Sequence, residues 1–145
     1  MATIKIFPLL ILIFFIFNIF TIVSGQTEAE TMMQECNEEY PLSEDEEASL
    51  RNMDDSATTN SKCFLACFLK KGGLMNEDGG INIERGHEMI NEKLQNDEET
   101  LKMVMEIYED CAAQQTNDDH CEIAAEFLIC CGAKVKEGNI DISVT

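Results

Sequence analysis

Residues 60–73 read Asn-Ser-Lys-Cys-Phe-Leu-Ala-Cys-Phe-Leu-Lys-Lys-Gly-Gly, and this stretch decides the fold. Asn60 is expected to cap a short, almost wholly apolar helix that ends at the pair Gly72-Gly73. Cys63 and Cys67 lie one helical turn apart, where Cβ atoms are about 5–6 Å from each other, whereas a disulfide needs roughly 3.5–4.5 Å. Each cysteine should therefore bond a different part of the chain, so that this helix is cross-linked to two other segments.

The remaining cysteines favour a disulfide framework. There are five of them: Cys36, Cys111, Cys121, Cys130 and Cys131. An exported chain meets an oxidising compartment, where cysteines normally pair. A structural zinc site is the alternative, but it usually needs two closely spaced pairs or histidines at set spacings. Only one such pair is present, so the sequence favours disulfides and implies neither a metal nor another cofactor.

The N-terminal segment has the pattern of a secretory signal peptide. Lys5 is followed by the apolar run 6–20 and then by small residues up to Gly25, which predicts a signal over residues 1–25 with cleavage near Gly25-Gln26. A membrane anchor is the alternative, because the run approaches the ~18 residues that a spanning helix needs. The compact, cysteine-rich remainder favours removal, secretion and no stable membrane insertion afterwards.

Strong acidity limits the partners of the exported chain. The formal net charge of the whole sequence is −18, and loss of the signal, which holds one lysine and no acid, makes it −19. Nucleic acid is excluded as a natural partner because phosphate binding needs positive charge, and anionic membrane surfaces are disfavoured for the same reason. Self-repulsion suits a highly soluble protein.

Capping residues and a 3.6-residue period of apolar positions predict an all-α domain over residues 26–145. Six short helices are expected, over about 27–39, 43–52, 60–71, 82–94, 96–111 and 116–131. The boxes that start at Thr27, Ser43 and Asn96 mark three of the starts, and Asn82 marks a fourth. Helices this short are not stable alone, so packing and cross-links must hold them together.

Helix geometry narrows the disulfide pairing without fixing it. With Cys131 set aside, six cysteines allow 15 connectivities. Cys63–Cys67 is disfavoured, and so is Cys121–Cys130, because nine residues of helix separate that pair by about 13 Å. Ten pairings remain.

The cysteine intervals point to a known family. Between Cys36 and Cys130 they are 26, 3, 43, 9 and 8 residues. This order resembles the six-cysteine pattern of insect odorant-binding proteins, the pheromone-binding and general odorant-binding family, and the C-x₃-C and C-x₈-C intervals are its specific parts. Segments 63–79 and 121–130 are also similar to that family, and the resemblance covers residues 26–145.

The resemblance implies a specific architecture. It implies the disulfides Cys36–Cys67, Cys63–Cys121 and Cys111–Cys130, one of the ten surviving pairings. It also implies an internal apolar pocket for a small hydrophobic ligand, and secretion into a lymph-like fluid. Cys131 departs from the family pattern; we expect a buried free thiol, and the alternatives are a bond to another chain or competition for Cys111.

A helical domain that is cross-linked by disulfides can tolerate an internal cavity. A void costs about 24 cal/mol per Å³, and three disulfides that each contribute about 2–4 kcal/mol can offset several kcal/mol of that cost. The expected lining residues are Phe68, Met75, Met89, Leu101, Met105, Tyr108, Phe127 and Leu128. For each of them, ordinary core packing is the alternative. Tyr108 could donate to a ligand oxygen or simply be a core tyrosine.

The C-terminal tail is a candidate lid. Ile140, Ile142 and Val144 alternate with polar residues and would face one way in an extended tail. Within the family, such tails can fold into or over the pocket, so residues 135–145 are interpreted as a lid, with a frayed terminus as the alternative. His87 and His120, both expected to be exposed, are the candidates for ligand release at low pH.

The sequence gives less support to function classes other than a carrier. A small phospholipase needs a histidine shortly after its cysteine pair, and Gly-Ala-Lys-Val follows Cys130-Cys131, so no enzyme is predicted. An EF-hand with Gly79 at its sixth position would have Leu74 at its first, where an acid is required. The remaining alternative is a secreted acidic protein with a non-olfactory lipid-carrier, defence or venom role. A membrane chemoreceptor is a candidate partner, and the expected state is a monomer or weak homodimer.

Overall fold

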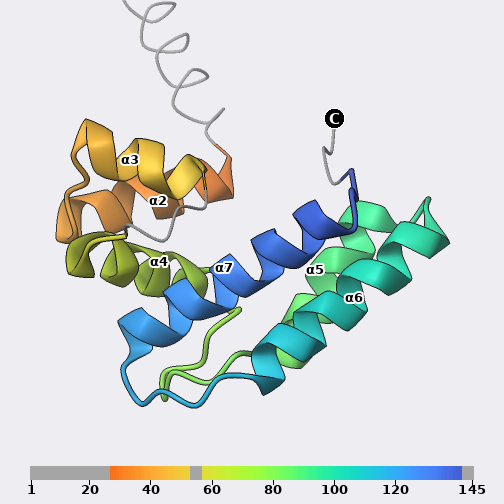
Figure 1. Ribbon diagram of the computed structural model, residues 1–145. Helices are drawn as coiled ribbons and strands as arrows, with labels where there is room; N and C mark the ends of the chain where they lie inside the picture. The colour runs from red at the N-terminus through yellow and green to blue at the C-terminus, as the bar shows by residue number, and fades with distance from the viewer. Residues whose placement is uncertain (1–26, 53–56, 142–145) are drawn as a thin grey trace, which may run out of the picture. The chain divides into compact units, whose positions relative to one another are not determined.

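The computed structural model describes residues 27–52 and 57–141. It contains the helices α2 (Glu28–Glu39), α3 (Glu44–Arg51), α4 (Thr59–Lys71), α5 (Ile83–Leu94), α6 (Glu98–Ala113) and α7 (His120–Glu137) (Figure 1). Within the described ranges there is no strand, only one isolated antiparallel bridge between Met75 and Ile81. The predicted all-α class with six helices is confirmed, whereas the predicted signal peptide lies outside the described residues.

Among the described residues, those from Met32 onward belong to one compact unit, and the first turn of α2, up to Thr31, belongs to another. In the described part of the chain, no helix combines the length and the apolar character that crossing a membrane would require.

Three helix starts follow the sequence prediction. At α2, Thr27 N–H donates to Glu30 Oε2 at 3.0 Å and Glu30 N–H donates to Thr27 Oγ1 at 3.2 Å, which is a reciprocal capping box. Ser43 and Glu46 form the same box at α3. The side chain of Asn82 caps α5 by accepting from the N–H of Arg85. Local side-chain chemistry was sufficient to place these boundaries.

Three other starts differ from the prediction. Thr58, not Asn60, caps α4, and the amide of Asn60 instead donates to the carbonyl of Pro41 at 2.7 Å. Asp97 caps α6 by accepting from the N–H of Thr100, one residue after the predicted Asn96. Asp119 caps α7, two residues after the predicted restart at 116–117. In each case several residues nearby have capping side chains, so the sequence offered more than one start.

Two helices end in Schellman motifs, in which a left-handed residue follows the helix. Gly73 at φ 75° ends α4, with Leu74 N–H bonded to Leu69 O at 2.8 Å, as the Gly72-Gly73 pair predicted. Asn139 at φ 51° ends α7, with Ile140 N–H bonded to Val135 O at 3.1 Å.

The end of α7 corrects the predicted tail. The helix does not stop near Cys131 but continues through Gly132 to Glu137, so residues 135–137 are helical and not part of an extended segment. Nothing in Gly132-Ala133 breaks the backbone hydrogen bonding. Only the left-handed turn after Gly138 ends it.

The three disulfides are Cys36–Cys67, Cys63–Cys121 and Cys111–Cys130, with Cα–Cα distances of 5.8, 4.4 and 5.7 Å. This is the pairing that the family resemblance implies. Cys67 joins α4 to α2, Cys63 joins it to α7, and the third bond joins α6 to α7. Two bonds thus leave adjacent turns of α4 toward different helices.

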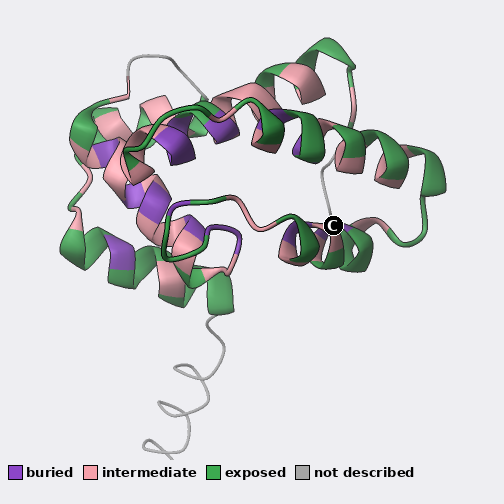
Figure 2. Ribbon diagram, turned by 90° about the horizontal axis from the view of Figure 1, so that it is seen from below, coloured by how far each residue is buried: buried purple, intermediate pink, exposed green. Residues whose placement is uncertain are grey.

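The hydrophobic core lies where α4 and α6 pack against α7 and where α5 packs against α6 (Figure 1). Its largest fully buried side chains include Leu69 of α4 and Phe127 of α7. Figure 2 shows buried and half-buried segments along α4 and α7, with exposed residues covering the outer sides of the helices. Apolar faces therefore meet inside, and the many acids lie outside.

Gly86 permits the closest contact in this core. A Cβ atom placed on Gly86 would lie 2.2 Å from Cζ of Tyr108, so only glycine lets the tyrosine ring approach α5. The phenol donates to the carbonyl of Asn82 at 3.0 Å, and its ring meets Phe127 edge-on at a centroid distance of 5.0 Å. Burial raises the pKa of Tyr108 to about 12, so the phenol stays protonated as a donor. A glycine that weakens helix propensity is thus required for packing.

We expect Gly86→Ala to lower the free energy of unfolding by about 1–3 kcal/mol, because overpacking outweighs the gain in helix propensity. Gly72→Ala is the matched control, since its Cβ would lie 3.5 Å from Phe68 O, an ordinary contact. Urea titration followed by circular dichroism measures both. Equal stability of the two variants would show that Tyr108 can move aside.

Cys131 is a free cysteine, as the sequence predicted, but it is half-buried and not fully buried. Burial raises the pKa of its thiol to about 11. Since only the thiolate is a good nucleophile, the native thiol should be poorly reactive near neutral pH.

We expect iodoacetamide to alkylate Cys131 about 100-fold more slowly in native protein than in urea-unfolded protein at a pH of about 8. The raised pKa in the fold lowers the fraction of the thiol that is ionised by about that factor. Mass spectrometry under non-reducing conditions follows the reaction at this single thiol. Similar rates in the two states would mean that the thiol is accessible and ionised in the fold.

Candidate functional site

An apolar cleft of about 420 Å³ lies between α2, α3 and α4. It is open to solvent. Its lining residues are Met33, Gln34, Asn37, Leu42, Glu47, Leu50, Arg51, Phe64, Leu65 and Phe68. All of them belong to the unit 32–145.

The walls of the cleft are held at its ends by one covalent bond and several polar contacts. The disulfide Cys36–Cys67 and the ion pair between Lys71 Nζ and Glu35 Oε2, at 2.8 Å, fix α2 against α4. The hydroxyl of Thr58 donates to Glu46, which joins the start of α4 to α3. These contacts position the helices without filling the space between them.

The turn between α2 and α3 is fixed in the same way. Asn37 Oδ1 accepts the N–H of Leu42 at 2.9 Å, and the amide of Asn60 on α4 donates to Pro41 O at 2.7 Å. These bonds hold the turn that carries Leu42, which lines the cleft. The Asn37 amide nitrogen remains a donor at the rim, which suits a ligand that carries one oxygen.

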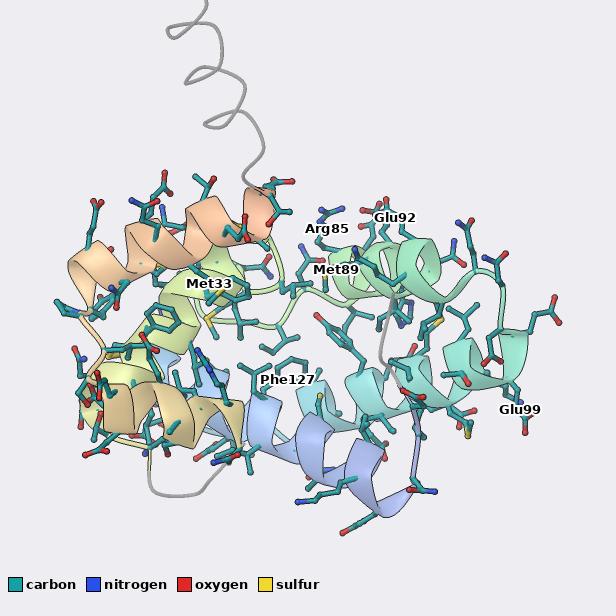
Figure 3. The ribbon with its side chains drawn as sticks, turned by 90° about the horizontal axis from the view of Figure 1, so that it is seen from above. Met33, Arg85, Met89, Glu92, Glu99 and Phe127 are labelled. Carbon is teal, nitrogen blue, oxygen red and sulfur yellow. A yellow bond between two sulfur atoms is a disulfide. The ribbon has the colours of Figure 1, made fainter. Side chains whose placement is uncertain are left out.

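The cleft has an apolar floor and a polar rim. Phe64 is buried at 6% exposure and forms the floor with its neighbours on α4, whereas Met33 on α2 is 50% exposed. Figure 3 shows the Met33 side chain pointing from α2 toward α3. Glu47 and Arg51 on the rim pair at 3.7 Å. Such a surface can bind an apolar molecule by removing it from water and can orient it through a few polar groups.

The described lining of the cleft is mainly apolar, and its polar and charged side chains are Gln34, Asn37, Glu47 and Arg51. A lining of this kind can bind an apolar molecule reversibly.

A second hollow of about 50 Å³ lies beside the cleft, between α3, α4 and α7. Its lining residues are Ser49, Leu50, Ala57, Leu65, Ala125, Leu128 and Ile129. Leu50 and Leu65 line both hollows.

The predicted lining residues mostly lie elsewhere. Of the eight, Phe68 lines the cleft and Leu128 lines the second hollow. The other six, Met75, Met89, Leu101, Met105, Tyr108 and Phe127, belong to the hydrophobic core or pack against it. Figure 3 shows Met89 and Phe127 on α5 and α7, apart from α2 and α3. For these six, the alternative of ordinary core packing describes their place in the structure.

Six of the nine cleft residues that the sequence did not predict come from the two most acidic helices, α2 and α3. Met33 lies in an acid-rich helix whose buried residue is Cys36, and Leu50 lies in α3, which buries none of its residues. An apolar side chain on an otherwise polar helix was the available signal.

The predicted lid and the histidines have different outcomes. Ile140 is half-buried after the end of α7, while Ile142 and Val144 lie outside the described residues, so the lid remains a prediction. Both histidines are half-buried and not exposed as expected. His87 Nε2 lies 2.8 Å from Glu109 Oε1, and His120 Nδ1 lies 2.8 Å from Lys70 Nζ. Neither lines the cleft.

Release of ligand through histidine protonation therefore remains a prediction. Binding measured at about pH 5 and about pH 7.5 tests it, because His is the side chain that ordinarily changes charge in that range. A flat profile would reject it.

In the part of the chain that the structure describes, these features define a domain of six helices and three disulfides with an open apolar cleft. The model of the PBP/GOBP family matches residues 23–134. The chain belongs to the PBP/GOBP family.

Two proteins of Drosophila melanogaster are similar in sequence. General odorant-binding protein 28a is 35% identical over 82 residues, which are 57% of this chain and 57% of that protein. General odorant-binding protein 19d is 27% identical over 118 residues, which are 81% of this chain and 79% of that protein. The alignment with the first relative thus spans little more than half of its length.

Solved structures share the fold. The structure of Drosophila melanogaster odorant-binding protein 28a has a TM-score of 0.66 and 27% identity, covering 78% of this chain and 93% of that one. A pheromone-binding protein of the cockroach Leucophaea maderae has a TM-score of 0.59 at 22% identity, covering 75% and 98%. A fatty acid binding protein from the oral disk of the blowfly Phormia regina has a TM-score of 0.54 at 26% identity, covering 78% and 97%.

Proposed function

We propose that the exported chain, residues 26–145, is a secreted carrier that binds and solubilises small hydrophobic ligands such as odorants or pheromones. The observation that carries this proposal is the apolar cleft of about 420 Å³. Its volume lies within the roughly 300–1,000 Å³ that is usual for small-molecule sites. Membership of the PBP/GOBP family supports the same function.

The cleft limits the size of the ligand. At about 30 Å³ per non-hydrogen atom, the share that a water molecule has in the liquid, 420 Å³ holds a molecule of about 14 such atoms. The apolar floor favours a hydrocarbon body, and the amides of Gln34 and Asn37 at the rim favour a single polar group at one end. The negative charge of the chain favours a neutral ligand over an anionic one in dilute salt.

A second candidate is a lipid carrier that has no part in olfaction. It is supported by the similarity to the blowfly protein, which is described as binding fatty acid. To distinguish the two candidate functions, one measures whether a neutral alcohol or the fatty acid of equal chain length competes more strongly for the site. A membrane chemoreceptor remains a candidate recipient of the ligand, and the monomer or weak homodimer remains a prediction.

Displacement of an uncharged fluorescent naphthylamine probe tests the carrier function. We expect wild-type protein to bind the probe and release it to medium-chain alcohols or esters. Protein that binds neither the probe nor any apolar compound would refute the proposal.

We expect Met33→Asp to weaken probe binding about 10-fold or more, because a carboxylate in the cleft must lose water when the ligand covers it. A tenfold change corresponds to about 1.4 kcal/mol. Met103→Asp is the matched control, since Met103 is also exposed, at 37%, but lies on α6 and does not line the cleft. If both substitutions weakened probe binding equally, the binding site would not be the cleft between α2, α3 and α4.

A further inference from the structure

The two hollows share two lining residues, both of them leucines. Leu50 of α3 and Leu65 of α4 line both the 420 Å³ cleft and the 50 Å³ hollow behind it. The far side of the small hollow is closed by Ala125, Leu128 and Ile129 of α7. An apolar chain that enters the cleft therefore meets a wall of leucine side chains before it can reach α7.

Leu50 and Leu65 differ in how firmly the surrounding backbone holds them in place. Leu65 lies between Cys63 and Cys67, which are bonded to α7 and α2, so its position is fixed on both sides. Leu50 lies in the last turn of α3, and this helix carries no cysteine. No residue of α3 is buried, so packing also holds it less tightly. Leu50 is the half of the wall whose side chain can be changed with little damage to the fold.

We infer that Leu50, against Leu65, sets the upper length of the apolar ligand that the cleft accepts. This inference rests on the proposed carrier function. With Leu50 present, a straight chain ends at the wall, at about 14 non-hydrogen atoms. Without it, the chain can continue into the hollow next to α7.

The lining behind the wall agrees with this role. Six of the seven described residues that line the small hollow are leucine, isoleucine or alanine, including both alanines, Ala57 and Ala125. A terminal methyl group of a ligand would find no charged neighbour among the described residues that line this hollow, whose polar member is Ser49. The charged side chains Glu47 and Arg51 lie instead at the rim of the cleft, on α3, so a ligand would enter with its apolar end leading.

Binding of a homologous series of straight-chain alcohols measures the length limit. Affinities from probe displacement, plotted against chain length for wild type, should rise and then level off or fall near about 14 carbons. For Leu50→Ala we expect the limit to move about three carbons or more toward longer chains, because the deletion adds the small hollow and the space of the lost side-chain atoms. Leu50→Phe should move the limit toward shorter chains.

Leu42→Ala is the matched control. Leu42 lines the cleft but not the second hollow, so the same deletion there should weaken binding without moving the length limit. A limit that does not change in Leu50→Ala and Leu50→Phe, or that moves equally in Leu42→Ala, would overturn the inference while wild-type binding still supports a carrier. Wild-type protein that binds no member of the series would instead overturn the carrier function. Circular dichroism confirms that each variant is folded.

Discussion

Two disulfides that leave adjacent turns of α4 are the constraint on which this structure depends. Because Cys63 and Cys67 lie one turn apart, too far to bond each other, each bonds a different helix, and α4 is joined to α7 and to α2 from adjacent turns. Sequence separations of 58 and 31 residues make the closed loops long, and each bond contributes about 2–4 kcal/mol by restricting the unfolded chain. Short helices of this kind would not persist in water without such support.

The same constraint explains why the molecule has an open cleft. A helix normally keeps its place by burying an apolar face, and a buried face leaves no space beside it. The acidic helix α2 buries Cys36, and α3 buries none of its residues. Cross-linking and hydrogen bonds hold these helices against α4, so the space between them need not be filled. The core on the other side of α4, where α5, α6 and α7 meet, is packed in the ordinary way.

Charge acts mainly at the surface of the helices. Three lysines bridge different helix pairs: Lys62 to Glu122, Lys71 to Glu35 and Lys134 to Asp110. All six side chains are at least one quarter exposed, and such pairs usually contribute about 0–1 kcal/mol. Their effect is to favour one arrangement of neighbouring helices, while the large excess of acid makes copies of the chain repel one another.

The sequence by itself determined the all-α class, the divergence of Cys63 and Cys67, and the caps of α2, α3 and α5. These features depend on residues within a few positions of one another, so local geometry specifies them. The pairing of the cysteines needed the family resemblance in addition, because ten pairings fit the helices equally well. Only the tertiary structure decided that Tyr108 and Phe127 pack in the core while Met33, Leu50 and Phe64 line the cleft. Periodicity shows which face of a helix is apolar, but whether a neighbouring helix covers that face depends on contacts between distant parts of the chain.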